Sequence, residues 1–449
     1  MSFLGNIFNT KKQAPENISV AKHIRVVVAS FADSLKMNGA RILFENLQEK
    51  DFLDVAYYSG SISSDTMKIS SKNLPEILDF CVRIFRKIPT DVIILGHQEK
   101  DKICLNFASY GEYEDLSEKN WRIFECLYLP ISLFENSSNI NGAALNLIVG
   151  ALLLCKKNIT TQDRSKQNTM LKQLIKFFEK DNSGKNFPLY CMPYILNLIA
   201  AIYFEYAEEN LDKRSFTLIK FMLQKALQYR NELIDKSHVA PIYIHLGNLF
   251  ATAAQNLNID SLICYKKSLQ SYRMAQKYFT KEDFPYDYAQ ISYLIAQLMF
   301  SQWRFTENLD SLREAISTLH QVEKIYTEKM FPASWAKLQH ELGYYLSLLG
   351  NYTGSIDVLQ LAIENMTNAQ KIFYAEKYPY IWLNIQADIG RIYYFIGKKH
   401  QDINNLQEAE KHLRSALVVA DEKNAESERR RIDSDISKTV ELIYLLQKN

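Results

Sequence analysis

The sequence predicts a mainly α-helical protein, in which a superhelical solenoid of α–α helix pairs follows a small α+β domain. The first observation behind this prediction is a repeat: three prolines, Pro285, Pro332 and Pro379, are each 47 residues apart. A fixed period of this length is typical of solenoids, whose units bury their apolar faces by stacking on one another. The second observation is that residues 20–135 do not repeat and alternate between helix-like and strand-like patterns.

The composition favours a helical protein of a reducing compartment. Among 449 residues there are only 14 glycines and 10 prolines, as expected where most of the chain lies in helix interiors. The 53 basic and 51 acidic residues nearly balance, which argues against nucleic acid as a partner. The six cysteines are scattered without a C-x-x-C pair, so we expect buried thiols, no metal site, no cofactor and a cytoplasmic protein.

The first helix of each repeat is predicted around one small residue that lets a neighbouring helix approach closely. An aliphatic residue precedes each small residue, and a large apolar residue follows three positions later, on the same helix face. The small residues are Ala200, Gly247, Ala296, Gly343 and Gly390.

A second helix is predicted in each unit from three residues spaced four and three apart, which lie on one helix face. These sets are Ile219, Leu223 and Ala226; Ser268, Tyr272 and Ala275; Ala315, Leu319 and Val322; Ser355, Leu359 and Ala362; and Ala409, Leu413 and Ala416.

These residues resemble the tetratricopeptide repeat, most clearly over Trp335–Glu364. The unit start FPASWAKLQHELG also resembles a bacterial group of such repeats with the pattern FPxxWAxxQxxLG. The units here are longer than the roughly 34 residues usual for the family. The resemblance covers about residues 190–420 and implies a solenoid that binds a protein or peptide in its concave groove.

Four regions are expected along the chain. Residues 1–19 form a flexible or amphipathic N-terminus, 20–135 the α+β domain, 136–425 a solenoid of five to six helix pairs, and 426–449 a capping helix. The first twelve residues suit a frayed terminus better than a docking peptide for a membrane or partner. The most apolar run, residues 142–155, is too short to span a bilayer and is expected to form a buried helix.

Within the α+β domain the pattern predicts helices over residues 19–37, 38–50 and 74–89 and a strand or hairpin over 54–63. Residues 91–98 and 102–111 are expected to form a hairpin across the turn EKDK, because two β-type runs flank a short polar turn. The apolar segment 121–134 is expected to pack this domain on the solenoid.

No catalytic motif supports an enzyme. Phosphate-binding glycine loops and H-E-x-x-H or G-x-S-x-G motifs are missing from the sequence, and the loop SGSISSD lacks the following acidic residues that would hold magnesium. His97 could act as a general base near Asp101 or Cys104, but a histidine at a hairpin end is more often only solvated. We therefore expect no catalytic residues in the repeats.

The candidate binding surface is the face of the first helices that does not pack between helices. This set is rich in amides and tyrosines, which suit peptide backbone and side chains, and Lys337 and Arg391 could bind carboxylates. Its members are Tyr194, Asn197, Asn248, Gln290, Tyr293, Gln297, Lys337, His340, Tyr344, Asn384, Arg391 and Tyr394.

Two hypotheses of function follow. The first is a non-enzymatic scaffold or adaptor that binds a protein or peptide in the groove, with a homo-oligomer compatible with the same surfaces. The second is a sensor or effector, in which the α+β domain binds a ligand or has an activity that the solenoid regulates. A closed polar pocket with perturbed titratable groups in the α+β domain would favour the second hypothesis.

Overall fold

The computed structural model describes residues 24–31, 39–63, 74–109, 126–135, 142–155, 172, 187–208, 211–257 and 259–448. The predictions for residues 1–19 and for most of 156–186 lie outside these described residues. The chain divides into two compact units, residues 20–298 and 299–449, and the division falls within one helix, α12 (Pro285–Thr306). The sheet and the first helix pairs therefore belong to the same compact unit, and the predicted boundaries at 135 and 425 stay predictions.

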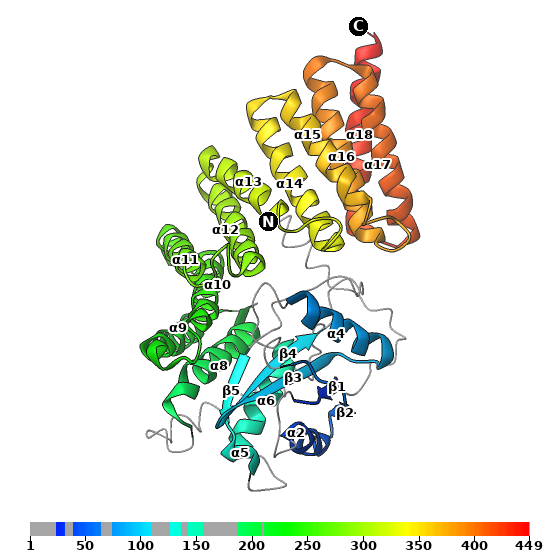
Figure 1. Ribbon diagram of the computed structural model, residues 1–449. Helices are drawn as coiled ribbons and strands as arrows, with labels where there is room; N and C mark the ends of the chain where they lie inside the picture. Colours follow the sequence, from blue (N-terminus) through cyan, green and yellow to red (C-terminus); the bar gives the residue numbers. More distant parts are fainter. Residues whose placement is uncertain are drawn as a thin grey trace. The chain divides into compact units, whose positions relative to one another are not determined.

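A five-stranded mixed sheet forms the N-terminal part of the first unit (Figure 1). Its strands are β1 (Ile24–Ala29), β2 (Leu53–Tyr58), β3 (Val92–Glu99), β4 (Lys102–Ser109) and β5 (Cys126–Pro130), in the order β2-β1-β3-β4-β5. β1 is parallel to β2 and β3, and the other neighbours are antiparallel. Helices α2 (Gly39–Gln48) and α4 (Leu74–Lys87) make the crossovers that parallel strands need.

One prediction for this region was wrong. The segment 19–37 was expected to be a helix, whereas its centre, IRVVVA, forms strand β1. β1 pairs on both sides, and all of its residues but Arg25 are buried. Strands buried on both faces appear in sequence as continuous apolar runs without alternation, so periodicity alone could not separate this strand from a helix.

The predicted hairpin is confirmed. β3 and β4 pair in a register that joins Glu99 to Lys102, which leaves Lys100 and Asp101 as a two-residue loop. Lys100 has a φ of 54°, as tight hairpin turns of the primed types require. This register places His97 directly opposite Cys104, on the same face of the sheet.

The helix-pair architecture is confirmed for five of the predicted repeats, each of which consists of two consecutive helices (Figure 1). The pairs are α8 (Met192–Ala207) with α9 (Lys213–Gln228), α10 (Val239–Asn256) with α11 (Ser261–Gln276), α12 with α13 (Leu309–Glu323), α14 (Pro332–Thr353) with α15 (Ile356–Gln370), and α16 (Pro379–His400) with α17 (Ile403–Glu422). The apolar run 142–155 forms helix α6 (Gly142–Cys155), which packs on α8.

The small residues act as the sequence predicts. A Cβ atom added to Gly343 would lie 2.9 Å from the backbone oxygen of Ala362 and 2.6 Å from Cγ of Met366, both on α15. A Cβ on Gly390 would meet Cγ of Leu413 on α17 at 2.8 Å. The missing side chains thus allow each second helix to approach the first closely.

The second-helix set of the fourth repeat needs a correction. Ser355 is the N-cap of α15, where its Oγ accepts a hydrogen bond from the backbone N–H of Val358, and it does not pack between the helices. The residues that pack there are Leu359, against Gly350, and Ala362, Met366 and Ala369, all fully buried. The last three form the set that the repeat predicts. They follow Ala315, Leu319 and Val322 by 47 residues, so the period that governs the first helices also governs the second.

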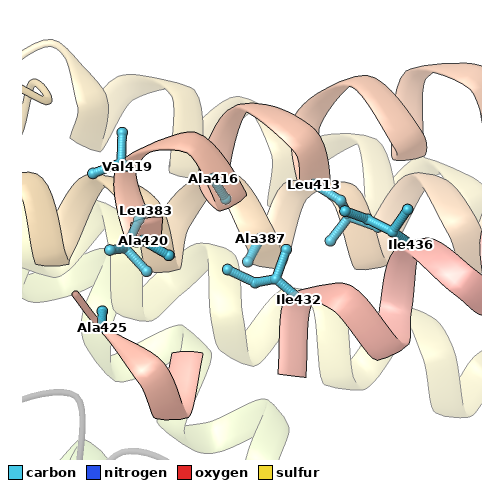
Figure 2. Close-up of a cluster of buried hydrophobic side chains, with 9 residues drawn as sticks. All are labelled: Leu383, Ala387, Leu413, Ala416, Val419, Ala420, Ala425, Ile432 and Ile436. Atoms are coloured by element: carbon cyan, nitrogen blue, oxygen red, sulfur yellow. The ribbon is translucent and has the colours of Figure 1, made fainter. Parts of the chain in front are cut away.

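Helix α18 (Glu426–Lys448) packs on the last helix pair. Figure 2 shows the apolar cluster that joins them, formed by Leu383 and Ala387 of α16, Leu413, Ala416, Val419 and Ala420 of α17, and Ala425, Ile432 and Ile436. Of the apolar face predicted for this helix, Ile432 and Ile436 are buried, whereas Val440 is 40% exposed. The contact therefore involves mainly the first half of α18.

One stretch, Leu189–Ala207, is long and apolar enough to cross a membrane by length and composition, and 61% of it is buried inside the structure. It comprises the short 3-10 helix η2 (Leu189–Cys191) and α8. α8 packs against α6, α9 and α10. Its apolar character thus matches its place as a core helix of the first repeat.

Candidate partner-binding surface

The twelve residues predicted to line a groove all lie on first helices, and none of them is exposed. Six lie on α8, α10 and α12 in the unit 20–298, and six lie on α14 and α16 in the unit 299–449. Tyr194, Asn197, Tyr293, His340 and Asn384 are buried, and the other seven are half-buried.

Tyr194 joins the first repeat to the sheet. Its ring centroid lies 5.0 Å from that of Tyr128 on β5, and its hydroxyl contacts Nδ1 of His238 at 2.8 Å. Burial, with smaller contributions from nearby thiols, raises the pKa of Tyr194 well above its usual value, so the hydroxyl stays neutral. The segment 121–134 was expected to pack the sheet on the solenoid, and Tyr128 makes this contact.

The amides in the same unit are engaged within the chain. Oδ1 of Asn197 lies 2.8 Å from Nδ1 of His245 on α10, which ties the first two repeats together. Asn248 accepts a hydrogen bond from the Tyr272 hydroxyl at 2.7 Å. Gln297 donates to the hydroxyl of Tyr293 at 2.9 Å. These side chains stabilise the stack, and Gln290 is the member that makes no hydrogen bond within the described part of the chain.

In the unit 299–449, the structure brings three predicted residues together around Asp388 of α16. Arg391 donates from Nη1 to Oδ1 of Asp388 and from Nε to Oδ2 of Asp435 on α18, both at 2.7 Å. Nε2 of His340 on α14 lies 3.6 Å from the other oxygen of Asp388. We call His340, Tyr344, Asp388, Arg391 and Asp435 the ion cluster.

The electrostatics of the ion cluster follow from its partial burial. Burial alone would lower the pKa of Arg391, but the charges of Asp388 and Asp435 and their hydrogen bonds outweigh it, so its pKa is raised. Burial, then the charge of Asp388, raises the pKa of Tyr344 to about 12, against the opposing effect of Arg304 and Arg391. At neutral pH the cluster therefore presents a permanent cation and a neutral phenol side by side.

The ion cluster is partly exposed to solvent. The side chain of Arg391 is 30% exposed and that of Asp435 is 23% exposed, whereas Asp388 is only 7% exposed. Lys337 and Tyr394, on the same two first helices, are half-buried as well. Asn384 differs from them, because its amide donates back to the Tyr380 carbonyl of its own helix at 2.8 Å.

A separate pocket of about 540 Å³ opens beside α16. Its walls are Ile356, Gln360, Ile363 and Glu364 of α15, Tyr393, Ile396 and His400 of α16, and Asp402 and Asn405 at the start of the last repeat helix. The ring of Tyr393 stacks on His412 of α17, with centroids 5.5 Å apart and planes at 13°. The pocket combines aliphatic walls with a few polar groups, as small binding pockets do.

Sequence reasoning missed the two carboxylates of the ion cluster. Asp388 precedes Arg391 by one helical turn, and this spacing could have indicated an ion pair. Asp435 lies 44 residues further along, and only the packing of α18 on α16 brings it to Arg391. The expectation that Arg391 binds carboxylates is thus met by carboxylates of the chain itself.

Comparison with known proteins identifies no family. No protein-family model matches the chain, and no curated protein is similar to it in sequence. Among solved structures, it is similar to a circular tandem repeat protein with novel repeat topology and enhanced subunit contact surfaces, at 11% identity and a TM-score of 0.25. The match covers 68% of this chain and 82% of that one.

Proposed function

We propose that the protein is a non-enzymatic interaction scaffold of the cytoplasm, and that its helix-pair repeats bind a protein or peptide partner. We infer further that the repeats are of the tetratricopeptide type, in the bacterial group with the FPxxWAxxQxxLG unit start. The close approach of paired helices at Gly343 and Gly390 supports this type of packing. Nucleic acid is not among the proposed partners.

The observation that carries the proposal is the half-buried first-helix face of α14 and α16. The apolar residues that pack between the paired helices are fully buried, and Arg391 also contacts Asp435 of α18. The face that remains offers Lys337, Tyr344, Arg391 and Tyr394, all half-buried. Tyrosine and arginine are the residue types that most often dominate the energy of protein interfaces, because they combine large rigid contact area with hydrogen bonding.

The test is affinity capture with the full chain, followed by mass spectrometry of the captured proteins. The surface variant is Lys337→Glu with Tyr394→Ala, which spares the ion cluster and hence the packing of α18. The matched control is Arg313→Glu with Tyr352→Ala, which makes the same change of charge and removes the same ring at exposed positions on α13 and α14. Circular dichroism should report the same helicity for all three proteins.

The proposal predicts that the wild type and the control capture one discrete partner and that the surface variant captures it about tenfold less or worse. Equal capture by all three proteins would show that the partner binds another surface and would contradict the proposed one. Capture lost equally in both variants would show a nonspecific effect of charge and would also contradict the proposal.

A sensor or effector is the second candidate function. It is favoured by one observation in the sheet: His97, Cys104 and Cys126 gather at its β3-β4-β5 side, although a solvated histidine and scattered cysteines were expected. His97 is only 3% exposed, so the expectation of a solvated hairpin end was wrong.

A further inference from the structure

Two cysteine sulfurs meet on the face of the sheet that carries His97. Sγ of Cys104 on β4 lies 3.0 Å from Sγ of Cys126 on β5. The register pairs Cys104 with Tyr128 and Asn106 with Cys126, so the two cysteines are diagonal neighbours on one face. All six cysteines are reduced in the structure. Because a disulfide bond is about 2.05 Å long, closing one here brings the two sulfurs about 1 Å closer together.

Polar groups from three neighbouring strands surround this sulfur pair. His97 of β3 is the direct cross-strand neighbour of Cys104. Asn106 donates from Nδ2 to Sγ of Cys104 at 3.6 Å. His97, Cys104 and Asn106 are each at most 3% exposed, whereas Cys126 is only half-buried. Cys126 is therefore the more exposed residue of the pair.

The surroundings favour a thiolate at Cys104. Burial raises its pKa, but the neighbouring Cys126 thiol, then His97 and, more weakly, His238 lower it further than burial raises it, so the net pKa is lowered. Tyr128, which faces Cys104 across the strands, has its pKa raised by burial and by the two thiols and stays a neutral phenol. The isolated, buried Cys81 behaves in the opposite way, because burial raises its pKa to about 12.

We propose that Cys104 and Cys126 form a dithiol–disulfide redox couple in the sheet, with Cys126 as the residue that external disulfides reach, Cys104 as the resolving residue and His97 as a positioning residue. The oxidant is a small-molecule disulfide such as oxidised glutathione. This activity is independent of partner binding by the repeats.

The chemistry balances with that oxidant alone. The sulfur of Cys126 gives up its proton to the Cys104 sulfur, attacks one sulfur of the external disulfide and expels the other as a thiolate, which forms a mixed disulfide. The Cys104 thiol then gives this proton to the released small-molecule thiolate, attacks the Cys126 sulfur and expels the second thiolate. In total one cysteine thiol and one cysteine thiolate are oxidised, one external disulfide is reduced, and one small-molecule thiol and one small-molecule thiolate are released.

The position of the couple distinguishes it from an isolated surface pair. Tyr128 lies opposite Cys104 in the register and packs on Tyr194 of α8 and on His238. The couple is thus next to the contact between the sheet and the first repeat. A change in the spacing of β4 and β5 on oxidation would act first on this aromatic contact.

The test is equilibration of the full chain in buffers of defined ratios of reduced to oxidised glutathione, followed by alkylation of the remaining thiols and peptide mapping. The proposal predicts a linked peptide pair that contains Cys104 and Cys126, formed reversibly while circular dichroism stays unchanged. Cys126→Ser should abolish both this pair and the mixed disulfide with glutathione. Cys104→Ser should instead trap the mixed disulfide at Cys126.

The matched control is Cys264→Ser, because Cys264 is a buried cysteine of α11 whose pKa is raised mainly by burial. This variant should form the 104–126 link as the wild type does. Absence of that link in the folded wild type would overturn the proposal. A zinc ion bound tightly enough to protect both thiols from alkylation would also overturn it, in favour of a metal site.

The role of His97 is tested by a separate measurement. The rate of disulfide formation with oxidised glutathione is measured against pH for the wild type and for His97→Asn, which keeps a polar side chain but removes the imidazole. The proposal predicts a midpoint about one pH unit higher in the variant. An unchanged midpoint would show that His97 has only a structural role and would overturn its assignment.

Discussion

Gln339 of α14 donates a hydrogen bond from Nε2 to Oε1 of Glu323, at the end of α13, over 2.6 Å. The same junction recurs one repeat later, where Gln386 donates to Gln370 at 3.3 Å. One repeat earlier, Gln276 donates to Oγ of Ser292 at 3.0 Å. In each case the partners are 16 residues apart, and the contacts follow one another at the 47-residue period. The end of each second helix is thus tied to the next first helix by a side-chain hydrogen bond.

We predict that Gln339→Met destabilises the protein more than Gln386→Met does. Gln339 is only 1% exposed and donates to a carboxylate, and loss of a buried donor to a charged group costs about 1.5–3 kcal/mol. Gln386 donates to a neutral amide, for which about 0.5–1.5 kcal/mol is expected. Urea unfolding of the two full-length variants measures the difference. Equal losses would mean that the charge of Glu323 contributes nothing at this junction.

The stability that Glu323 contributes at this junction should also depend on pH. The hydrogen bond from His320, opposed by burial and helped by Gln339, lowers the pKa of Glu323. A carboxyl group with a lowered folded-state pKa stabilises the protein above its unfolded pKa, near 4.5, and this contribution disappears as the pH falls through the folded value.

We therefore expect the wild type to be more stable than Glu323→Gln near neutral pH and the difference to shrink as the pH falls below about 4. Urea midpoints of both proteins across this range provide the measurement. A difference in stability that stays constant from neutral to acidic pH would contradict the assignment.

Gly343→Ala should destabilise the fourth helix pair. The added methyl group would lie 2.9 Å from a backbone oxygen of α15, which cannot move as a flexible side chain can. Overpacking of this kind costs about 1–3 kcal/mol, which exceeds the gain of up to about 1 kcal/mol in helix propensity.

Gly390→Ala should destabilise its helix pair less than Gly343→Ala does. Its methyl group would meet chiefly the side chain of Leu413, and the nearest backbone oxygen lies at 3.1 Å. Thermal unfolding should therefore show a smaller loss for Gly390→Ala than for Gly343→Ala. The reverse order would show that close helix approach at the small-residue positions does not set the stability of the pairs.

Arg391→Leu should destabilise the contact of α18 with α16. The substitution leaves Asp388 and Asp435 without their shared cation, and removal of one partner of a buried ion pair costs about 3–5 kcal/mol. We expect the lower end of this range because Asp435 is partly exposed.

A double-mutant cycle with Asp435→Asn isolates the pair. Because the two sites interact directly, the double variant should be more stable than the sum of the single losses predicts. Strictly additive losses in urea unfolding would show that Arg391 and Asp435 do not stabilise one another.

The sequence was most informative where packing repeats. The spacing of 47 to 49 residues between small residues located all five first helices, because a residue without a bulky side chain is required at each close helix approach. The fourth second helix was misaligned because Ser355, Leu359 and Ala362 also show the four-and-three spacing. The structure distinguishes the two registers through Met366, which faces Gly343.

The sequence was least informative where antiparallel strands bring distant residues together. The hairpin across EKDK was recognisable from the sequence, and the structure shows that its register places His97 opposite Cys104. Cys126 lies 22 residues beyond Cys104, and only the pairing of β5 with β4 brings the two sulfurs into contact. Asp435 reached Arg391 in the same way, through the packing of a helix that the repeat does not specify.

The most direct test of the proposed scaffold is photo-crosslinking from single positions of the full chain in cells. The photoreactive residue p-benzoylphenylalanine replaces Tyr394, on the half-buried face of α16, or Tyr352, which is 60% exposed at the end of α14. We predict that the probe at Tyr394 crosslinks to one discrete partner and that the more exposed probe at Tyr352 does not. Crosslinks from Tyr352 to the same partner, or none from Tyr394, would contradict the assignment of the binding surface to the first helices.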